Sequence, residues 1–412
     1  MIRGSRIFGF VLAAALAGGQ VTAQGLRVRS TLGSWATLAG ADSVDATLGY
    51  QNRQTLGGGI RVMWAPSAGP FRFEIHNHTS MTQGGDVAFA AALAPLLPAP
   101  PPATLFDLTQ TWLMNGDTVA TNTFDRLNVS YTSPNLVLRA GRQAITWGSG
   151  TVFHPGDIVA PFAPNAVDTT YKTGVDMIYA QYLFQSGADI QAIAVPRPAV
   201  TGGPVVHDSS TFALRARAAN DSLDASVLLA RDRGDLVAGL GLGGALGGAS
   251  WNAEYLNWQL AGGGSYPSWL FSVSNFGALF GANIAYFAEY FHNGFGVSPA
   301  LALDALPASL TKRLATGQVF FAGTDFLALG AQVQLSPDVV LAPNAIVSLN
   351  DHSVLAGLVL NVTLGDNTDL VVNATHPMGS AGTEFGGRET SAGSGVYLGP
   401  AQSVAVKVVH FF

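Results

Sequence analysis

The end of the chain alternates in polarity with a period of two residues. Val404, Val406 and Val408 share one parity with Phe412, whereas Lys407 has the other parity. Because side chains along a β-strand point alternately to its two faces, this pattern predicts an extended strand with one apolar face. A single strand leaves its backbone hydrogen-bonding groups unpaired, so the segment requires a surrounding sheet.

The same alternation recurs along most of the chain. Residues 127–131, 212–217 and 327–335 each place apolar side chains on one face. Any one of these segments could belong to a soluble, half-buried sheet, but their repetition favours a transmembrane β-barrel. Strands that cross a membrane need roughly 9–11 residues with an apolar outer face, and the sheet must close because lipid cannot pair with backbone groups.

Composition agrees with a surface that faces lipid. Of all residues, 48% are hydrophobic and only 11% are charged, which is little charge for a secreted soluble domain. The chain has no Cys, which excludes disulfides, thiolate chemistry and a lipidated cysteine. No apolar run after residue 23 reaches the ~18 residues that a transmembrane helix needs. No basic run indicates a nucleic-acid partner.

The ends of the chain predict export and insertion. Arg3 and Arg6 precede an apolar stretch at 7–17 and a small residue, Ala23, so residues 1–23 are predicted to be a cleaved secretory signal peptide. We expect residues 24–43 to form a periplasmic tail or small element. The transmembrane barrel is then predicted to cover residues 44–412.

The C-terminal strand resembles the closing strand of Gram-negative outer-membrane β-barrels, with His410 in place of the usual aromatic residue two positions before Phe412. The resemblance implies a location in the outer membrane, among its lipid bilayer and lipopolysaccharide. It also implies that the barrel-insertion machinery reads this strand. The alternative is a soluble edge strand that happens to end in Phe.

The connections predict an antiparallel, all-β barrel of about 16–18 strands, with short periplasmic turns and long external loops. Short links rich in turn-forming residues are expected at 65–69, 132–135, 185–188, 219–222, 275–278, 336–338 and 365–368. Long links are expected at 80–121, 147–173, 197–209, 291–323 and 377–402.

The most distinctive motif lies between Arg139 and Gly148. Its pattern of Gly-Arg-Gln at 141–143, then Ile145 and Trp147, resembles one in porin-like outer-membrane families, including the alginate-export type. The resemblance implies a barrel that passes small solutes, but it names no solute.

Loop 147–173 is predicted to fold into the lumen as a constriction, because it is rich in Pro and Gly yet carries several large apolar residues. Asp157 and Asp168 would then narrow the lumen. The alternative is a loop that packs on neighbouring external loops. The apolar residues in question are Phe153, Ile158, Val159 and Phe162.

Strand parity places basic side chains inside the barrel. An Arg on the lipid-facing side near the midplane would cost ~2–4 kcal/mol, so inward parity is expected. A basic wall facing the loop carboxylates would sort solutes by charge. The alternative is a set of hydrated lumen residues at different heights. The predicted pore-lining residues are Arg61, Arg72, Glu74, Arg126, Arg139, Asp157, Asp168, Arg215 and Arg217.

Three charged positions need separate comment. Arg142 has the apolar parity of its strand, so it requires a bulge, a position at the rim or a different register. Glu254 and Glu289 are interpreted as further lumen residues that balance charge.

The sequence does not predict an enzyme. No His-x-Ser-Asn-Gly-like nucleophile arrangement is present, and His352 is interpreted as part of a polar turn. His76 and His78 alternate onto one strand face, but two His residues without a third ligand do not predict a metal site. We therefore expect neither a metal nor another cofactor.

The predicted function is an outer-membrane, porin-like channel for small solutes. Two alternatives remain open: a substrate-specific transporter or exporter of hydrophobic or polymeric compounds, and a closed structural or adhesive barrel. Apolar stretches at 87–103 and 300–314 lie in predicted external loops. They could cap the barrel, bind a hydrophobic substrate, or join barrels in a homo-oligomer.

Overall fold

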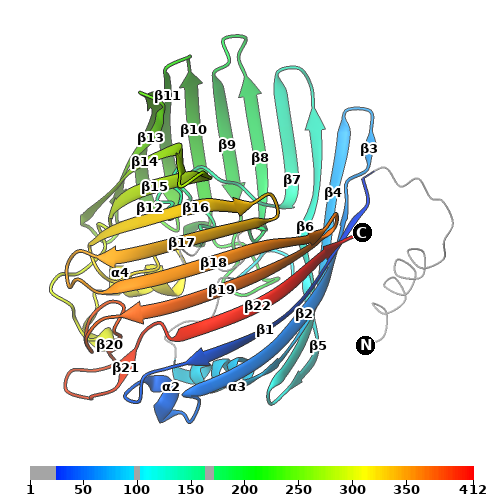
Figure 1. The fold of residues 1–412 in the computed structure, drawn as a ribbon. Helices are drawn as coiled ribbons and strands as arrows, with labels where there is room; N and C mark the ends of the chain where they lie inside the picture. The colour runs from blue at the N-terminus through cyan, green and yellow to red at the C-terminus, as the bar shows by residue number, and fades with distance from the viewer. Residues whose placement is uncertain (1–24, 97–102, 163–170) are drawn as a thin grey trace.

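The computed structural model describes residues 25–96, 103–162 and 171–412, which form a closed antiparallel barrel of 18 strands (Figure 1). Each wall strand pairs with its neighbour in the chain, and β22 closes the barrel by pairing with both β19 and β1. The wall strands are β1 (Arg27–Leu38), β2 (Asn52–Trp64), β4 (Phe71–Gly84), β6 (Thr118–Thr132), β7 (Leu136–Gln143), β8 (Val175–Leu183), β9 (Asp189–Val195), β10 (Thr211–Ala219), β11 (Leu223–Asp232), β12 (Asp235–Leu246), β13 (Ala249–Gln259), β14 (Ser265–Leu279), β15 (Ala282–His292), β16 (Asp325–Ser336), β17 (Val339–Ser348), β18 (Val354–Gly365), β19 (Thr368–Met378) and β22 (Gln402–Phe411).

Smaller elements lie in the connections. Strand β3 (Ser67–Ala68) pairs with β4, and β5 (Thr109–Asn115) pairs with β6. Strands β20 (Arg388–Glu389) and β21 (Tyr397–Leu398) form a separate two-stranded sheet. The helices are α2 (Val44–Thr47), α3 (Gly85–Leu93) and α4 (Ala308–Ala315), with 3₁₀ turns η1 (Ala94–Leu96), η2 (His207–Ser209) and η3 (Leu303–Ala305).

The prediction of an all-β barrel is confirmed, but the predicted start of the barrel is wrong. Residues 27–38, expected in a periplasmic tail, form wall strand β1, which pairs along its length with β2. Its outward parity includes Ser30 and Ser34, which weakens the polarity contrast that reveals a strand. The barrel domain was expected to begin at residue 44, but Val44–Thr47 is helix α2, capped by the Ser43 side chain. The predicted signal peptide, residues 1–23, lies outside the described residues.

The connections alternate in length from β1 to β11 and again after β15, as predicted, whereas those between β11 and β15 are all short. The turn expected at 275–278 lies instead at residues 280–281, after the end of β14. The long ones, residues 39–51, 85–117, 144–174, 196–210, 293–324 and 379–401, all leave one end of the barrel, here called the long-loop end. The opposite end, here called the short-turn end, carries the tight turns. At the long-loop end, β11 and β12 are joined by only two residues, Arg233 and Gly234, both with positive φ as this kind of hairpin requires.

The two faces of the wall differ in polarity. On β10, Phe212 and Leu214 are about half exposed on the outward parity, whereas Ala213 and Arg215 have the inward parity. The outward face therefore forms an apolar surface around the barrel, as a lipid-facing wall requires. Among the described residues, no helix is long and apolar enough to cross a membrane.

Two apolar clusters fill part of the barrel interior towards the long-loop end. The first packs Trp147 and Ile158 against inward side chains of β8–β13 and against Leu310 of α4. The second packs Phe153 and Phe321 against inward side chains of β14–β18. Residues from the connections 144–174 and 293–324 thus line the inner face from β8 to β18.

Candidate solute pathway

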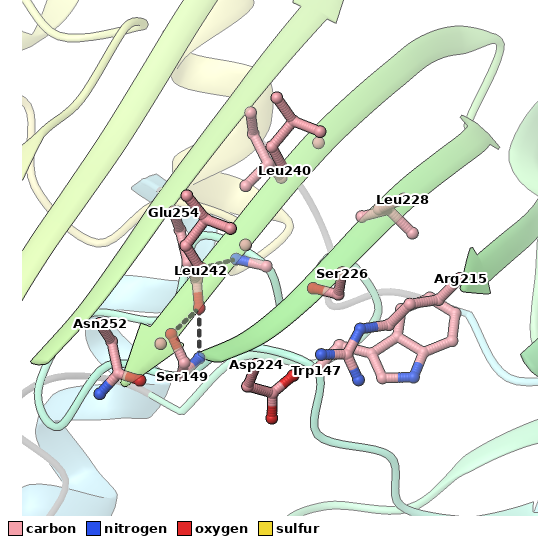
Figure 2. A pocket seen from close by; sticks show the side chains of 15 residues that line it. Trp147, Ser149, Arg215, Asp224, Ser226, Leu228, Leu240, Leu242, Asn252 and Glu254 are labelled. Carbon is pink, nitrogen blue, oxygen red and sulfur yellow. Dashed lines mark hydrogen bonds between the residues drawn. The ribbon is translucent and has the colours of Figure 1, made fainter. Parts of the chain in front are cut away.

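Two carboxylates on the barrel wall hold the segment 149–156. Glu254 of β13 accepts hydrogen bonds from the Ser149 backbone N–H, from the Ser149 hydroxyl at 2.6 Å and from the Gly156 N–H at 2.9 Å (Figure 2). Both Glu254 and Glu289 are buried. The interpretation of these residues as charge balance is therefore incomplete, because the described contacts of both carboxylates are mainly to loop backbone.

Glu289 of β15 makes the matching attachment farther along the loop. Its two oxygens accept the N–H groups of Thr151 at 2.7 Å, Val152 at 3.0 Å and Phe153 at 2.6 Å. The aromatic ring of Phe153 then stacks on Phe291 with ring centroids 4.9 Å apart. Three successive backbone groups are thereby fixed to one strand of the wall.

The carboxylate of Asp157 stabilises the loop through contacts within the loop itself. It accepts from the Trp147 and Gly148 N–H groups and pairs with Lys172 at 2.7 Å, and it is only 5% exposed. Burial lowers the pKa of Lys172, and Asp157 opposes that shift. Asp157 therefore does not offer a free charge to a solute, and the other predicted loop carboxylate, Asp168, lies outside the described residues.

The predicted basic residues do not form a single cluster. Arg72, Glu74 and Arg139 line one cavity of ≈ 610 Å³, together with Tyr179 and Gln181. These residues come from β4, β7 and β8, and they lie in the half of those strands nearer the short-turn end. This cavity has hydrogen-bonding groups of both charges on its wall.

A second cavity, of ≈ 220 Å³, lies at the seam where the first and last strands meet. It is lined by Arg29 of β1, Arg61 of β2, Lys407 of β22 and Tyr171, as well as by Thr31 and His78. The guanidinium carbons of Arg61 and Arg29 lie 4.3 Å and 5.2 Å from the centroid of the Tyr171 ring. Arg61 also pairs with Asp125.

Arg29 and Lys407 were absent from the predicted site residues. Arg29 lies in the segment expected to be a tail, and Lys407 had the inward parity of β22 without a basic neighbour in sequence. Pairing of β22 with β1 brings these strands together. Only closure of the barrel reveals this juxtaposition.

Arg126 has a structural rather than an open position. It is buried and donates to the backbone carbonyl of Lys172, at the end of the loop, and to that of Asp125 at 2.7 Å. Asp125 is the extra residue of a bulge in β6, opposite His76 and Asn77. Arg126 thus helps to fix the second end of the loop.

Arg215 lines a smaller cavity of ≈ 90 Å³ between the loop and β10–β13, with Trp147 and Glu254 on its walls (Figure 2). Strand β12 contributes Gly239, Gly241 and Gly243, whose missing side chains leave this space. Arg217 lies near the short-turn end, where it pairs with Asp224, and both side chains are exposed.

The contacts of Arg142 account for its outward parity. Its guanidinium makes two hydrogen bonds to Asp176, at 2.8 and 2.7 Å, and a third to the carbonyl oxygen of Phe106. Strand β7 ends one residue later, at Gln143, so this outward ion pair lies at the end of the strand and beneath the segment that leads into β5. Of the three explanations considered, a position at the rim is correct.

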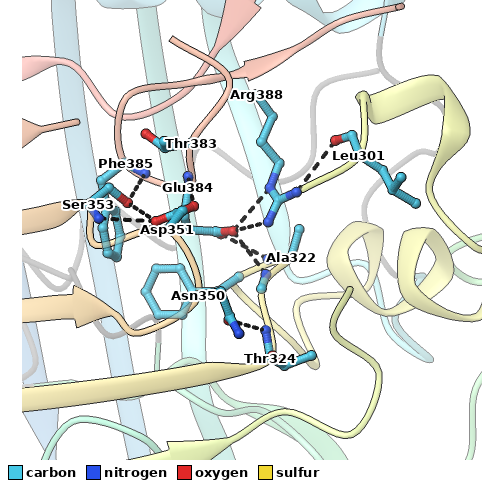
Figure 3. A network of polar contacts seen from close by, with 12 residues as sticks. Leu301, Ala322, Thr324, Asn350, Asp351, Ser353, Thr383, Glu384, Phe385 and Arg388 are labelled. Atoms are coloured by element: carbon cyan, nitrogen blue, oxygen red, sulfur yellow. Dashed lines mark hydrogen bonds and ion pairs between the residues drawn. The ribbon is translucent and has the colours of Figure 1, made fainter. Parts of the chain in front are cut away.

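The long-loop end is held by a polar network (Figure 3). Glu384 accepts the N–H groups of Ala322 and Gly323 at 2.9 Å and pairs with Arg388. The neighbouring connection joins the same network, since Asp351 accepts the Glu384 N–H at 2.7 Å. Three connections of the long-loop end are therefore fixed to one another.

The two apolar stretches have different environments. In the second, helix α4 buries Leu310, and Arg313 pairs with Asp235 at 2.8 Å. In the first, α3 is attached through Asp86, which pairs with Arg53 of β2. No group of three or more His, Cys, Asp or Glu residues in the described part of the chain could hold a metal ion.

Comparison with known proteins identifies the fold of the chain but does not assign the chain to a family. No protein-family model matches the chain, and no curated protein matches it. A BenF-like porin from Pseudomonas fluorescens matches with a TM-score of 0.54 and 9% identity over 94% of this chain and 99% of that chain. Pseudomonas aeruginosa OccK8 (OprE) gives 0.54 and 9% over 94% and 97%, and Acinetobacter baumannii OccAB3 gives 0.52 and 9% over 94% and 99%. The chain therefore has the fold of outer-membrane porins.

Proposed function

We propose that this protein is an outer-membrane, porin-type channel for small hydrophilic solutes, constricted by the loop 147–173, and that it is not an enzyme. The observation that carries the proposal is the double attachment of that loop to Glu254 and Glu289. A segment bound to two strands of the inner wall would narrow the path of any solute through the barrel.

The pathway is proposed to run along one side of the lumen. Inward apolar clusters occupy the wall from β8 to β18 towards the long-loop end, whereas the two polar cavities lie along β22 to β9. Arg29, Arg61 and Lys407 in one cavity and Arg72 and Arg139 in the other outnumber the carboxylates of Glu74 and Asp125. An excess of cations along the pathway favours anions. Arg126, Arg215 and Arg217 would add to this positive field without contacting the solute.

Location and partners follow from the same proposal. The apolar outer face would contact the bilayer and lipopolysaccharide of the outer membrane, with the long-loop end outside the cell. Strand β22, ending at Phe412, would be read by the barrel-insertion machinery. Residues 1–23 would be removed as a signal peptide, and no cofactor is required.

A solute-specific channel is the second candidate, and the network of Glu384, Arg388 and Asp351 favours it over a wide, unselective pore. Connections that are fixed to one another would restrict the entrance at the long-loop end. A specific channel would show small conductance and a current that its own solute blocks.

Planar-bilayer recording of the refolded protein in a salt gradient tests the proposal. We expect open steps whose reversal potential shows anion preference, and a weaker preference in the double variant Arg72→Ala plus Arg139→Ala. Arg231→Gln, which removes an outward-facing cation, is the matched control and should keep the preference. A correctly folded barrel without open steps would refute the channel, and open steps indifferent to the double variant would refute the basic pathway.

A further inference from the structure

The outward face of β9–β13 carries a groove of ≈ 610 Å³. Its sides are the exposed side chains of Phe212, Leu214, Leu229 and Leu236, and small residues such as Ala238 form its floor. The register confirms that these residues share one face, because Leu214 pairs with Leu229 and Leu229 pairs with Ala238. The groove is thus a largely apolar depression in the outer wall, lined by the kind of side chains against which a hydrocarbon chain packs.

A cation stands at the end of this groove nearest the long-loop end. Arg231 pairs across the sheet with Phe212 and Leu236, so it has the outward parity. Among the Lys and Arg residues of the described wall strands, only Arg142 shares that parity, and Arg142 is buried against Asp176. An outward Arg is tolerated where a barrel meets lipid headgroups, but not in the hydrocarbon region.

The surroundings of Arg231 leave it able to bind an anion. Its one described ion pair is to Asp208, with N and O atoms 3.1 Å apart, and the two side chains are 47% and 74% exposed. Such an exposed pair contributes little and is readily exchanged. His207 lies beside it, with its ring centroid 6.0 Å from that of Phe212. A phosphate could replace Asp208 as the partner of the guanidinium.

The width of the polar end indicates a broad headgroup. Leu236 pairs with Gln259 of β13, so Gln259 lies two strands away from Arg231 in the same row of paired residues and on the same face. Two strand spacings amount to about 10 Å. That separation suits a phosphorylated disaccharide better than a single glycerol phosphate.

We propose that this groove is a binding site for a lipid A-type phosphoglycolipid of the outer leaflet, with an acyl chain against Ala238 and a headgroup phosphate on Arg231. The inference rests on the proposed outer-membrane location with the long-loop end outside. It concerns the outer wall alone and is independent of passage through the lumen.

Native mass spectrometry of the refolded, delipidated barrel, titrated with lipid A in detergent, tests the site. We expect one lipid A per barrel, and about tenfold weaker binding in Arg231→Gln, the effect of losing a charge-assisted hydrogen bond. Ala238→Leu fills the groove without changing charge and should also weaken binding. Asp208→Asn removes the competing carboxylate and should strengthen it.

Controls separate this site from general lipid adhesion. Ala345→Leu adds the same bulk to the outward face of β17, and Arg217→Gln removes a cation near the short-turn end, so both should bind lipid A as the wild type does. Three results would each overturn the proposal. They are equal binding of lipid A by the wild type and Arg231→Gln, equal binding of lipid A and phosphatidylglycerol by the wild type, and a lipid-free dimer in which a second barrel covers the groove. Conductance of the same preparation is recorded in parallel. A barrel that conducts but does not bind lipid A would refute this site and leave the proposed channel function standing.

Discussion

Replacing Glu289 by Gln should release the loop from the wall while leaving the barrel intact. In the protein, one oxygen of Glu289 accepts two backbone N–H groups, from Val152 and Phe153, and the other accepts that of Thr151. The amide of Gln has one oxygen and one NH₂ group of the same shape. Whichever way the amide is turned, its NH₂ group faces at least one backbone N–H, and that hydrogen bond is lost.

The magnitude follows from the kind of bond. A hydrogen bond to a charged group contributes about 1.5–3 kcal/mol, and each 1.4 kcal/mol or so is tenfold in an equilibrium constant. The population of barrels with the loop displaced from Glu289 should therefore rise between roughly tenfold and a hundredfold. Glu254→Gln should act in the same direction, because Glu254 accepts from Ser149 and Gly156 in the same way.

Single-channel recording measures the displaced population as openings larger than the main conductance step. Asp369→Asn is the matched control, because it also removes one inward carboxylate charge. Asp369 has the inward parity of β19, and its described hydrogen bond is to Thr363 and not to the loop. If Glu289→Gln and Asp369→Asn give the same record as the wild type, then the carboxylate contacts do not hold the loop.

Three further outcomes are expected. Burial lowers the pKa of His154 below 6.5, with Asp157 opposing the shift and Lys172 adding to it, so a displaced loop binds the proton more readily. Large openings should therefore become more frequent as pH falls below 6.5, and His154→Asn should remove that part of the dependence. Gly241→Val should leave the conductance of the step unchanged, because the added side chain, whose Cβ would lie 2.7 Å from the Ser226 hydroxyl oxygen, fills only the small cavity beside the loop, outside the proposed pathway; a lowered step would mean that solutes pass through this cavity. Phe326→Ala should cost about 3–5 kcal/mol, since Phe326 is 0% exposed in the second apolar cluster, and a heat-unfolding temperature equal to that of the matched exposed variant Phe276→Ala would contradict this.

Parity allowed the sequence to predict which face of a strand is polar, since an apolar outer wall leaves a strong period-two signal in strands such as β10. It could not predict β1, where Ser30 and Ser34 occupy the outward parity. Nor could it group the basic residues by height, because height depends on the stagger of all the strands around the barrel. Arg61 and Arg72 were expected on one wall and line separate cavities.

The contacts that position the loop were also beyond local patterns. The Ser149 hydroxyl and Glu254 are 105 residues apart, and Thr151 and Glu289 are 138 residues apart. Nothing in either strand distinguishes a carboxylate that faces water from one that accepts loop backbone. Such pairs become visible only when the chain is closed into a barrel.

The attachments nevertheless have a chemical logic that a sequence can carry. A loop that enters a barrel without helix or strand must find acceptors for its own N–H groups, and a carboxylate offers acceptors alone. The loop in turn must bring several N–H groups to one point, which requires a tight path: a Cβ at Gly150 would lie 1.9 Å from the Phe153 carbonyl oxygen, and one at Gly156 would lie 3.0 Å from Glu254. Two features of a sequence therefore predict an inward-folded loop more specifically than the apolar residues of the loop do. The first is a pair of inward carboxylates, on strands distant from the loop in sequence, that have no basic residue beside them in the sequence. The second is a set of closely spaced glycines in one long connection.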